Sequence, residues 1–205
     1  DITMLTNFWT NLNCRAVYGP TLSGLSRWSL SSQGWMKSLL MEKKNREMEI
    51  EIFNGSRNIL GKLIPGGIEC MQLGFGTGCD VLRENDGPIV LILEDWNGEK
   101  VATLRQLDSI ISHDDFSKVV GVLLGRFPLM TSESYEQWSK KVNVTTEVVR
   151  RLTAARPELF VGNLVDFGHP STYSQEKEEE FLAVPSGVAA EANLQDGGGK
   201  LIFEF

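Results

Sequence analysis

Hydrophobic and polar positions follow different periods in different parts of the chain, and the period predicts the secondary structure. Glu47 to Ile52 alternates charged and apolar residues, which predicts a half-buried antiparallel strand. Ile89 to Leu93 and Val119 to Leu124 are continuously apolar, as in strands that are buried on both faces. Gly187 to Leu194 and Lys200 to Phe205 are separated by a run of glycines, which predicts a terminal hairpin.

Other segments have the spacing of a helix, with apolar residues every three or four positions. The first begins the chain, from Asp1 to Asn13, with Ile2, Leu5, Phe8, Trp9 and Leu12 on one side. Further helices are expected around Trp35 to Leu40, from Val101 to Ile111 and from Thr145 to Thr153. The remaining expectations are short strands at Arg15–Tyr18, at Ile59–Ile64 before Pro65-Gly66-Gly67, and at Leu159–Val165, and a serine-rich loop at Ser23–Gln33.

Mixed strands with helices between some of them predict a mixed α/β fold. A boundary is expected between Pro20 and Ser32, so that residues 1–22 end one domain and residues 23–205 form another with its own core. The first piece, a helix and a strand, is too small to fold alone. Asp1 opens directly onto an apolar helix without an initiator methionine, and we therefore expect the chain to be part of a longer protein.

Composition narrows the function classes. The 205 residues carry a net charge of −7 and no basic cluster, which argues against a nucleic-acid partner. No apolar run is long enough to span a bilayer and no secretion signal is visible, so no membrane partner is expected. The three cysteines form no C-x-x-C pair, so a disulfide framework or a zinc site is not expected, and we expect a protein of the reducing cytoplasm.

Two residues stand out as candidates for chemistry. Glu94 follows the apolar run that starts at Ile89, and His169, one of two histidines, lies between Gly168 and Pro170. A carboxylate that orients an imidazole lets it act as a general base to a serine. The alternatives are that Glu94 is solvated or paired with Arg126, and that His169 is structural.

Several short motifs in a fixed order resemble the LD-carboxypeptidase group of serine peptidases, which includes the microcin C self-immunity peptidases. Each motif is weak alone, but the ordered set extends over almost the whole chain. The motifs are Gly61-Lys62-Leu63-Ile64, Gly66-Gly67, Gly76-Thr77, Ile92-Leu93-Glu94-Asp95, Leu104-Arg105-Gln106-Leu107, Val119 to Phe127, Phe167-Gly168-His169 and Val184-Pro185-Ser186-Gly187. Ile68 stands where the family often has asparagine.

The resemblance implies a fold and an activity. It implies a C-terminal swivelling-type β/α domain with a mixed sheet, preceded by the last helix and strand of a Rossmann-like N-terminal domain. The family's enzymes are cytoplasmic, usually dimeric serine hydrolases without a metal or another cofactor. They cleave an amide bond near a free carboxyl terminus, in murein peptides or in peptidyl-nucleotide antibiotics.

The resemblance also implies site residues. Glu94 would be the acid and His169 the base of a Ser-Glu-His triad. Asp1 would follow the family's serine, so that its backbone N–H helps to bind the oxyanion while the serine lies outside this chain. Gly66, Gly67 and Trp28 are candidates for substrate binding, whereas Trp35 is expected to pack in the core.

Two functions remain open at this point. The first is the C-terminal portion of a serine carboxypeptidase that is inactive without its nucleophile-bearing segment. The second is a binding or assembly module that uses the same cleft without chemistry. The serines between Ser23 and Ser32 lack a nucleophile-elbow pattern, and we expect none of them to replace the missing nucleophile. His113, before Asp114 and Asp115, is expected to be a cap or a surface residue.

Overall fold

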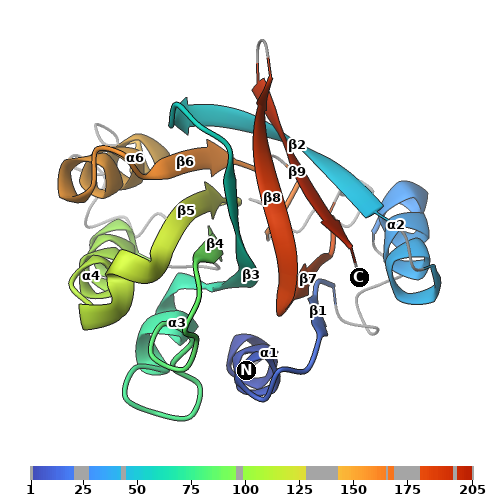
Figure 1. The fold of residues 1–205 in the computed structure, drawn as a ribbon, viewed down its shortest axis with the longest axis horizontal. Helices are drawn as coiled ribbons and strands as arrows, with labels where there is room; N and C mark the ends of the chain where they lie inside the picture. The colour runs from blue at the N-terminus through green and yellow to red at the C-terminus, as the bar shows by residue number, and fades with distance from the viewer. Residues whose placement is uncertain are drawn as a thin grey trace.

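The computed structural model describes residues 2–20, 28–42, 45–95, 99–127, 143–164, 166–168, 181–195 and 198–204 (Figure 1). Its helices are α1 (Ile2–Asn11), α2 (Leu30–Met41), α3 (Ile68–Leu73), α4 (Lys100–Ile111), the 3-10 helix η2 (Asp114–Lys118) and α6 (Val144–Ala155). Its strands are β1 (Ala16–Tyr18), β2 (Asn45–Asn54), β3 (Ile59–Gly67), β4 (Ile89–Glu94), β5 (Val119–Leu124), β6 (Phe160–Asn163), β7 (Val184–Ser186), β8 (Val188–Gln195) and β9 (Gly198–Glu204).

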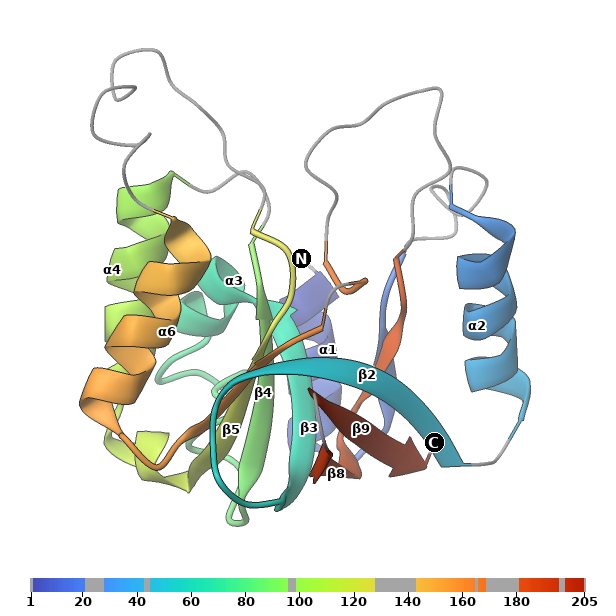
Figure 2. The same ribbon diagram turned by 90° about the horizontal axis from the view of Figure 1, so that it is seen from above.

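Most of the described strands close into a barrel in the order β2-β6-β5-β4-β3-β8-β9. Neighbours among β3, β4, β5 and β6 are parallel, and the other pairs in the barrel are antiparallel. Outside the barrel, β1 pairs with β7. Helices α4 and α6 lie on one side of the barrel and α2 on the opposite side (Figures 1 and 2). The predicted mixed α/β fold with a mixed sheet is confirmed.

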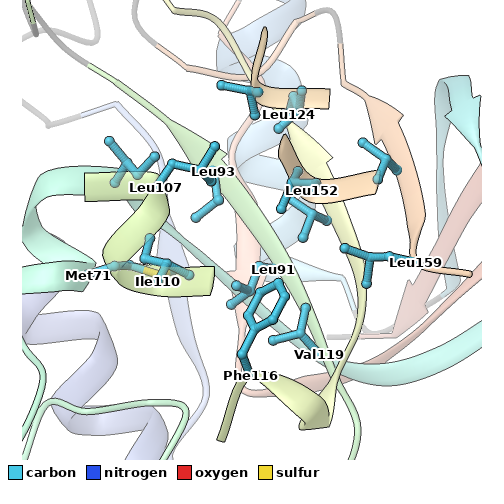
Figure 3. Close-up of a cluster of buried hydrophobic side chains, with 14 of the residues drawn as sticks. Met71, Leu91, Leu93, Leu107, Ile110, Phe116, Val119, Leu124, Leu152 and Leu159 are labelled. Atoms are coloured by element: carbon cyan, nitrogen blue, oxygen red, sulfur yellow. The ribbon is translucent and has the colours of Figure 1, made fainter. Parts of the chain in front are cut away.

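Alternation along β4 divides the hydrophobic residues between two cores. Leu91 and Leu93 point outward into the core that α3, α4 and α6 cover, where Leu107 and Leu152 pack on them (Figure 3). Val90 and Ile92 belong to the second core, which fills the barrel and continues to β1, β7 and α2. Because successive strand residues face opposite sides, a strand between two cores must be apolar at every position, as the uninterrupted run predicted.

The expected strands at β2, β4 and β5, the terminal hairpin of β8 and β9, and helices α1, α4 and α6 are confirmed. The serine-rich loop was wrong in its second half, because α2 begins at Leu30. The Ser29 hydroxyl caps that helix by accepting a hydrogen bond from the Ser32 N–H at 3.0 Å. Serine is common in loops and at helix N-caps for the same reason: its hydroxyl binds nearby backbone groups.

Strand β3 is longer than expected and continues through Pro65 to Gly67. Its pairing with β8 ends at Leu63, whereas its pairing with β4 continues to the end of the strand. Pro65 therefore lies where one side of β3 needs no ladder hydrogen bond, so its missing N–H is tolerated. In contrast, β6 is shorter than expected and ends at Asn163. The sequence patterns also missed α3 and β7.

Helix α1 has the predicted spacing, but its polar side is the one that packs on the described part of the chain. Thr3, Thr6, Asn7 and Thr10 are buried. The large apolar residues on the other side of α1, together with Leu12 directly after the helix, are 43% to 55% exposed: Ile2, Leu5, Phe8, Trp9 and Leu12. None of the described helices is long and apolar enough to cross a membrane.

Packing inside the barrel is expected to contribute strongly to the free energy of unfolding. Ile92 is fully buried there, whereas Leu60 on the adjacent strand β3 is 63% exposed. Replacing Ile92 with Ala should lower the free energy of unfolding by about 2–5 kcal/mol, because a cavity remains in a closed core. The matched variant Leu60→Ala should change it by less than about 0.5 kcal/mol. Urea unfolding of the chain measures both, and equal losses would contradict the packing described.

Candidate active site

The carboxyl ends of the parallel strands meet at one edge of the barrel and bring the candidate residues together. Glu94 is the last residue of β4, and its register partner at the end of β3 is Gly67. Next to β4, strand β5 ends at Leu124 and continues into Gly125 and Arg126. The end of a parallel sheet is where functional loops gather, because all its strands point their carboxyl ends the same way.

The neighbouring carboxylates of Glu94 and Asp95 point to opposite sides of β4 and have different partners. Glu94 continues the inward series of Val90 and Ile92, is only 2% exposed, and accepts a hydrogen bond from the Tyr18 hydroxyl at 2.9 Å. Asp95 accepts a hydrogen bond from Thr103 on α4. The alternative of a solvated Glu94 is therefore wrong.

Arg126, the expected alternative partner of Glu94, makes an ion pair with Asp166. Its guanidinium lies 3.4 Å from the Asp166 carboxylate. Its backbone N–H donates to the Phe167 carbonyl at 2.8 Å, which ties the chain after β5 to the segment that ends at Gly168.

A chain of hydrogen bonds connects Glu94 to helix α1. The Gly67 N–H donates to Thr3 Oγ1 at 3.1 Å, and the Thr3 hydroxyl donates to Tyr18 Oη at 3.3 Å. Tyr18 then donates to Glu94 Oε1 at 2.9 Å. We call Gly67, Thr3, Tyr18 and Glu94 the acid relay. Sequence reasoning missed Thr3 and Tyr18; the available signal was the threonines that recur along α1 opposite its apolar side.

The environment of Tyr18 keeps its phenol protonated. Burial raises the pKa of Tyr18 far above its ordinary value, and the negative charge of Glu94 raises this pKa further. Both effects have the same cause: a phenolate would be a second buried anion beside a carboxylate. Tyr18 therefore acts as a hydrogen-bond donor to Glu94 over the ordinary pH range.

Gly168, the residue before His169, lies directly against Glu94. Its φ of +94° is in the left-handed region, and a Cβ built on it would lie 3.0 Å from both Glu94 Cβ and the Arg126 nitrogen. Both the backbone angle and the space therefore require glycine at this position. His169 and Asp1 lie outside the described residues, and their roles stay predictions.

The predicted substrate-binding residues fall into two groups. Gly66 and Gly67 lie against α1: a Cβ on Gly66 would be 2.6 Å from Thr3 Cγ2, and one on Gly67 would be 3.6 Å from Thr3 Oγ1. Trp28 is buried against Phe181, with ring centroids 5.0 Å apart. These contacts are structural observations, and a role in substrate binding stays a prediction for all three residues.

Aromatic rings connect Trp28 to the acid relay. The Phe181 and Phe167 centroids are 6.0 Å apart, and those of Phe167 and Tyr18 are 5.8 Å apart. Within the described part of the chain, the buried indole Nε1–H of Trp28 has no hydrogen-bond partner. The expected core role of Trp35 is confirmed, because it packs against the second core and its Nε1–H donates to the Ala183 carbonyl at 2.7 Å.

Two other expectations concern residues away from the relay. His113 caps η2, as predicted, by accepting the Asp115 N–H on Nδ1 at 3.1 Å. Its Nε2 lies 3.2 Å from the Asp80 carboxylate. Ile68 is fully buried in the outer core, so the position where the family often has asparagine is a packing position here. Among the described residues, no group of three or more His, Cys, Asp or Glu side chains is arranged to hold a metal ion.

The family model for the LD-carboxypeptidase C-terminal domain matches residues 60–188. This range includes Gly66, Gly67, Glu94 and Gly168 and covers more than half of the chain. The chain therefore belongs to the LD-carboxypeptidase family, and the matched residues are of its C-terminal domain. Among curated protein sequences, none matches the chain.

Solved structures share the fold at low sequence identity. The muramoyltetrapeptide carboxypeptidase from Oxalobacter formigenes has a TM-score of 0.77 and 15% identity over 100% of this chain and 67% of that chain. The MccF-like protein from Bacillus anthracis has a TM-score of 0.72 and 16% identity over 98% and 65%. The MccF-like protein from Streptococcus pneumoniae, solved with AMP, has a TM-score of 0.69 and 16% identity over 98% and 66%. The chain spans about two thirds of the length of each.

The raised pKa of Tyr18 predicts a loss of stability at alkaline pH. In the unfolded chain Tyr18 ionises near its ordinary pKa of 10.0, whereas the folded chain keeps the proton at higher pH. Its contribution to stability is thus complete below pH 10.0 and falls above it, by up to about 1.4 kcal/mol per pH unit. Urea unfolding of the wild type and of Tyr18→Phe across this range measures the effect. The wild type should lose stability more steeply, and parallel pH dependences would refute the assignment.

Proposed function

We propose that the full gene product, meaning this chain with any segment that precedes Asp1, is a serine-type carboxypeptidase. It would hydrolyse an amide bond near a free carboxyl terminus. The observation that carries the proposal is a buried carboxylate, Glu94, at the carboxyl end of β4, in contact with the glycine that precedes His169. The membership of the chain in the LD-carboxypeptidase family supports the same reaction class.

In the proposed mechanism, Glu94 accepts the imidazole N–H of His169 and fixes its tautomer and orientation. The other imidazole nitrogen takes the proton of a serine hydroxyl as the serine oxygen attacks the substrate carbonyl. The imidazolium then protonates the leaving amine, and water releases the acyl group by the same steps. The buried anion at Glu94 would stabilise the imidazolium, which is why its burial and its hydrogen bonds favour this role.

The oxyanion of the tetrahedral intermediate needs donors at a separate position. We propose that the backbone N–H of Asp1 is one of them, because Asp1 directly precedes α1. The first N–H groups of a helix have no partner within the helix, and its dipole favours negative charge there. In this proposal the serine precedes Asp1, so this chain by itself has no turnover.

The substrate class follows from the relatives only as a proposal. One similar structure is a muramoyltetrapeptide carboxypeptidase, and another MccF-like protein was solved with AMP. We propose a murein LD-peptide or a peptidyl-nucleotide as substrate, with Gly66, Gly67 and Trp28 contributing to its site. No cofactor or metal is part of the mechanism. A cytoplasmic homodimer is the proposed working state.

We propose that residues 1–22 belong structurally to a nucleophile-bearing domain and residues 23–205 to the domain with Glu94 and His169. The exposed apolar side of α1 supports this division, because four large apolar side chains on the helix, with Leu12 directly after it, are a surface suited to burial. The chain spans about two thirds of the length of its structural relatives, and in this proposal the nucleophile-bearing segment covers that side.

The triad assignment predicts a specific pattern of activity in the full gene product. Glu94→Gln should lower kcat by roughly 10⁴-fold, because the amide keeps the shape but loses the charge that orients the imidazole. His169→Gln should lower kcat by at least as much. The matched controls are Asp95→Asn, whose side chain binds α4, and His113→Gln, whose side chain caps η2; both should keep most of the activity.

Hydrolysis of an LD-peptide and of a peptidyl-nucleotide, followed by mass spectrometry, measures turnover and separates the two substrate classes. Wild-type hydrolysis of neither substrate, with binding of one of them, would support the alternative of a binding module. Undiminished activity of the Glu94→Gln and His169→Gln variants would contradict the triad.

The domain assignment predicts that the apolar side of α1 contributes to the free energy of unfolding only in the full gene product. In this chain alone, the double variant Leu5→Gln/Phe8→Gln should leave the free energy of unfolding within about 0.5 kcal/mol, because both side chains are exposed. In the full gene product it should lower that free energy by about 3 kcal/mol or more. Leu40→Gln, on the exposed side of α2, should have no effect in either context. Thermal and urea unfolding distinguish these outcomes.

A further inference from the structure

We propose that Tyr18 and Thr3 are positioning residues for Glu94, and that the acid relay fixes the orientation of the triad carboxylate through a series of hydrogen bonds. The inference rests on the proposed function and adds two residues to it. Neither residue is assigned a direct contact with the substrate; both act through Glu94.

The three hydrogen bonds of the relay run in one direction. The Gly67 N–H can only donate, and an ionised Glu94 can only accept. Each hydroxyl between them has one proton, so Thr3 accepts from Gly67 and donates to Tyr18, while Tyr18 accepts from Thr3 and donates to Glu94. All three hydrogen bonds therefore point toward the carboxylate, and each polarises the next. The arrangement aims hydrogen-bond donors at the Glu94 carboxylate and so holds one side of it in place.

Burial of Glu94 makes the hydrogen bonds to its carboxylate necessary. Glu94 and Tyr18 are 2% and 3% exposed, and Thr3 is 1% exposed, so bulk water cannot solvate the carboxylate along this side. A buried polar group that lacks hydrogen bonds costs free energy, so donors to the carboxylate are needed on this side. The Tyr18 hydroxyl supplies a donor that stays protonated, because burial and, after it, the negative charge of Glu94 raise the pKa of Tyr18.

The relay also fixes the direction of the Glu94 side chain. Tyr18 binds Oε1 and so fixes the rotation of the carboxylate that would receive the imidazole of His169. The Tyr18 ring is held against Phe167, two residues before His169, with ring centroids 5.8 Å apart. Gly67 leaves space for the pair, since a Cβ there would be 3.3 Å from Oε1 and 4.0 Å from the Tyr18 oxygen.

The position of Thr3 gives the relay a second consequence. Thr3 lies two residues after Asp1, in the first turn of α1, where the proposed oxyanion donor and nucleophile would be located. The same hydroxyl binds the end of β3 and, through Tyr18, the end of β4. The relay therefore connects the helix start that would carry the nucleophile turn with the acid of the triad, two elements that are far apart in the sequence.

The test compares Tyr18→Phe, Thr3→Val and Thr3→Ser in the full gene product with an LD-peptide or a peptidyl-nucleotide as substrate. Tyr18→Phe should lower kcat roughly 10- to 100-fold with KM nearly unchanged, as expected for one lost hydrogen bond to a charged group. The acidic limb of the pH profile, which reports protonation of the base His169, should move to higher pH, because a Glu94 carboxylate that loses a hydrogen-bond donor directs more of its negative charge at the imidazolium. Thr3→Val should lower kcat and move the acidic limb in the same directions, but by less. Thr3→Ser should restore the wild-type kcat and pH profile.

Thr10→Val is the matched control, because Thr10 is a buried threonine on the same side of α1 whose hydroxyl bonds to Ser186 at 2.8 Å. It should lower thermal stability but leave kcat and the pH profile as in the wild type. If Tyr18→Phe and Thr3→Val behave like Thr10→Val, the relay is structural only and the inference is wrong. If Glu94→Gln and His169→Gln keep full activity, the proposed function itself is wrong, so the two failures are distinct.

Discussion

The close approach of α1 to the ends of β3 and β4 is the constraint on which the rest of the site depends. Gly66 and Gly67 have no side chain at the point where Thr3 enters, and a Cβ on Gly66 would lie within 2.6 Å of the Thr3 methyl group. Small threonines on the helix and glycines on the strand let the two backbones approach. The Thr3 hydroxyl can then bond to both the Gly67 N–H and Tyr18. If α1 did not come this close to β3 and β4, Glu94 would be buried but the series of hydrogen bonds from Gly67 and Thr3 could not form.

Strand alternation is the second constraint, and it assigns different tasks to two adjacent carboxylates. Glu94 follows Val90 and Ile92 inward, whereas Asp95 bonds to Thr103 on the outer helix α4. A one-residue shift of β4 would exchange the two sides. The full burial of the strand opposes such a shift, because Leu91 and Leu93 already fill the outer core. The hydrophobic packing of the barrel therefore determines which carboxylate reaches the site.

Helix α1 shows why sequence patterns predict elements more readily than their surroundings. The spacing of its apolar residues correctly predicted a helix, because that spacing depends on the helical period alone. The side of the helix that packs on the barrel is the threonine side, since the neighbouring glycine strand accepts only small side chains. The same limitation applies to Tyr18: a short strand before Gly19 and Pro20 was expected, but its partner, Glu94, is 76 residues away.

By itself, the sequence determined most of the elements, the mixed α/β class and the family, because periods, turns and ordered motifs are local properties. It also singled out Glu94 through its place at the end of an apolar run. Only the tertiary structure decided that the barrel closes, that Glu94 points inward, and that Thr3 and Tyr18 bond in series to it. Those features depend on contacts between segments that are distant in the sequence, and no local pattern encodes such contacts. Close packing of the whole chain brings these segments together.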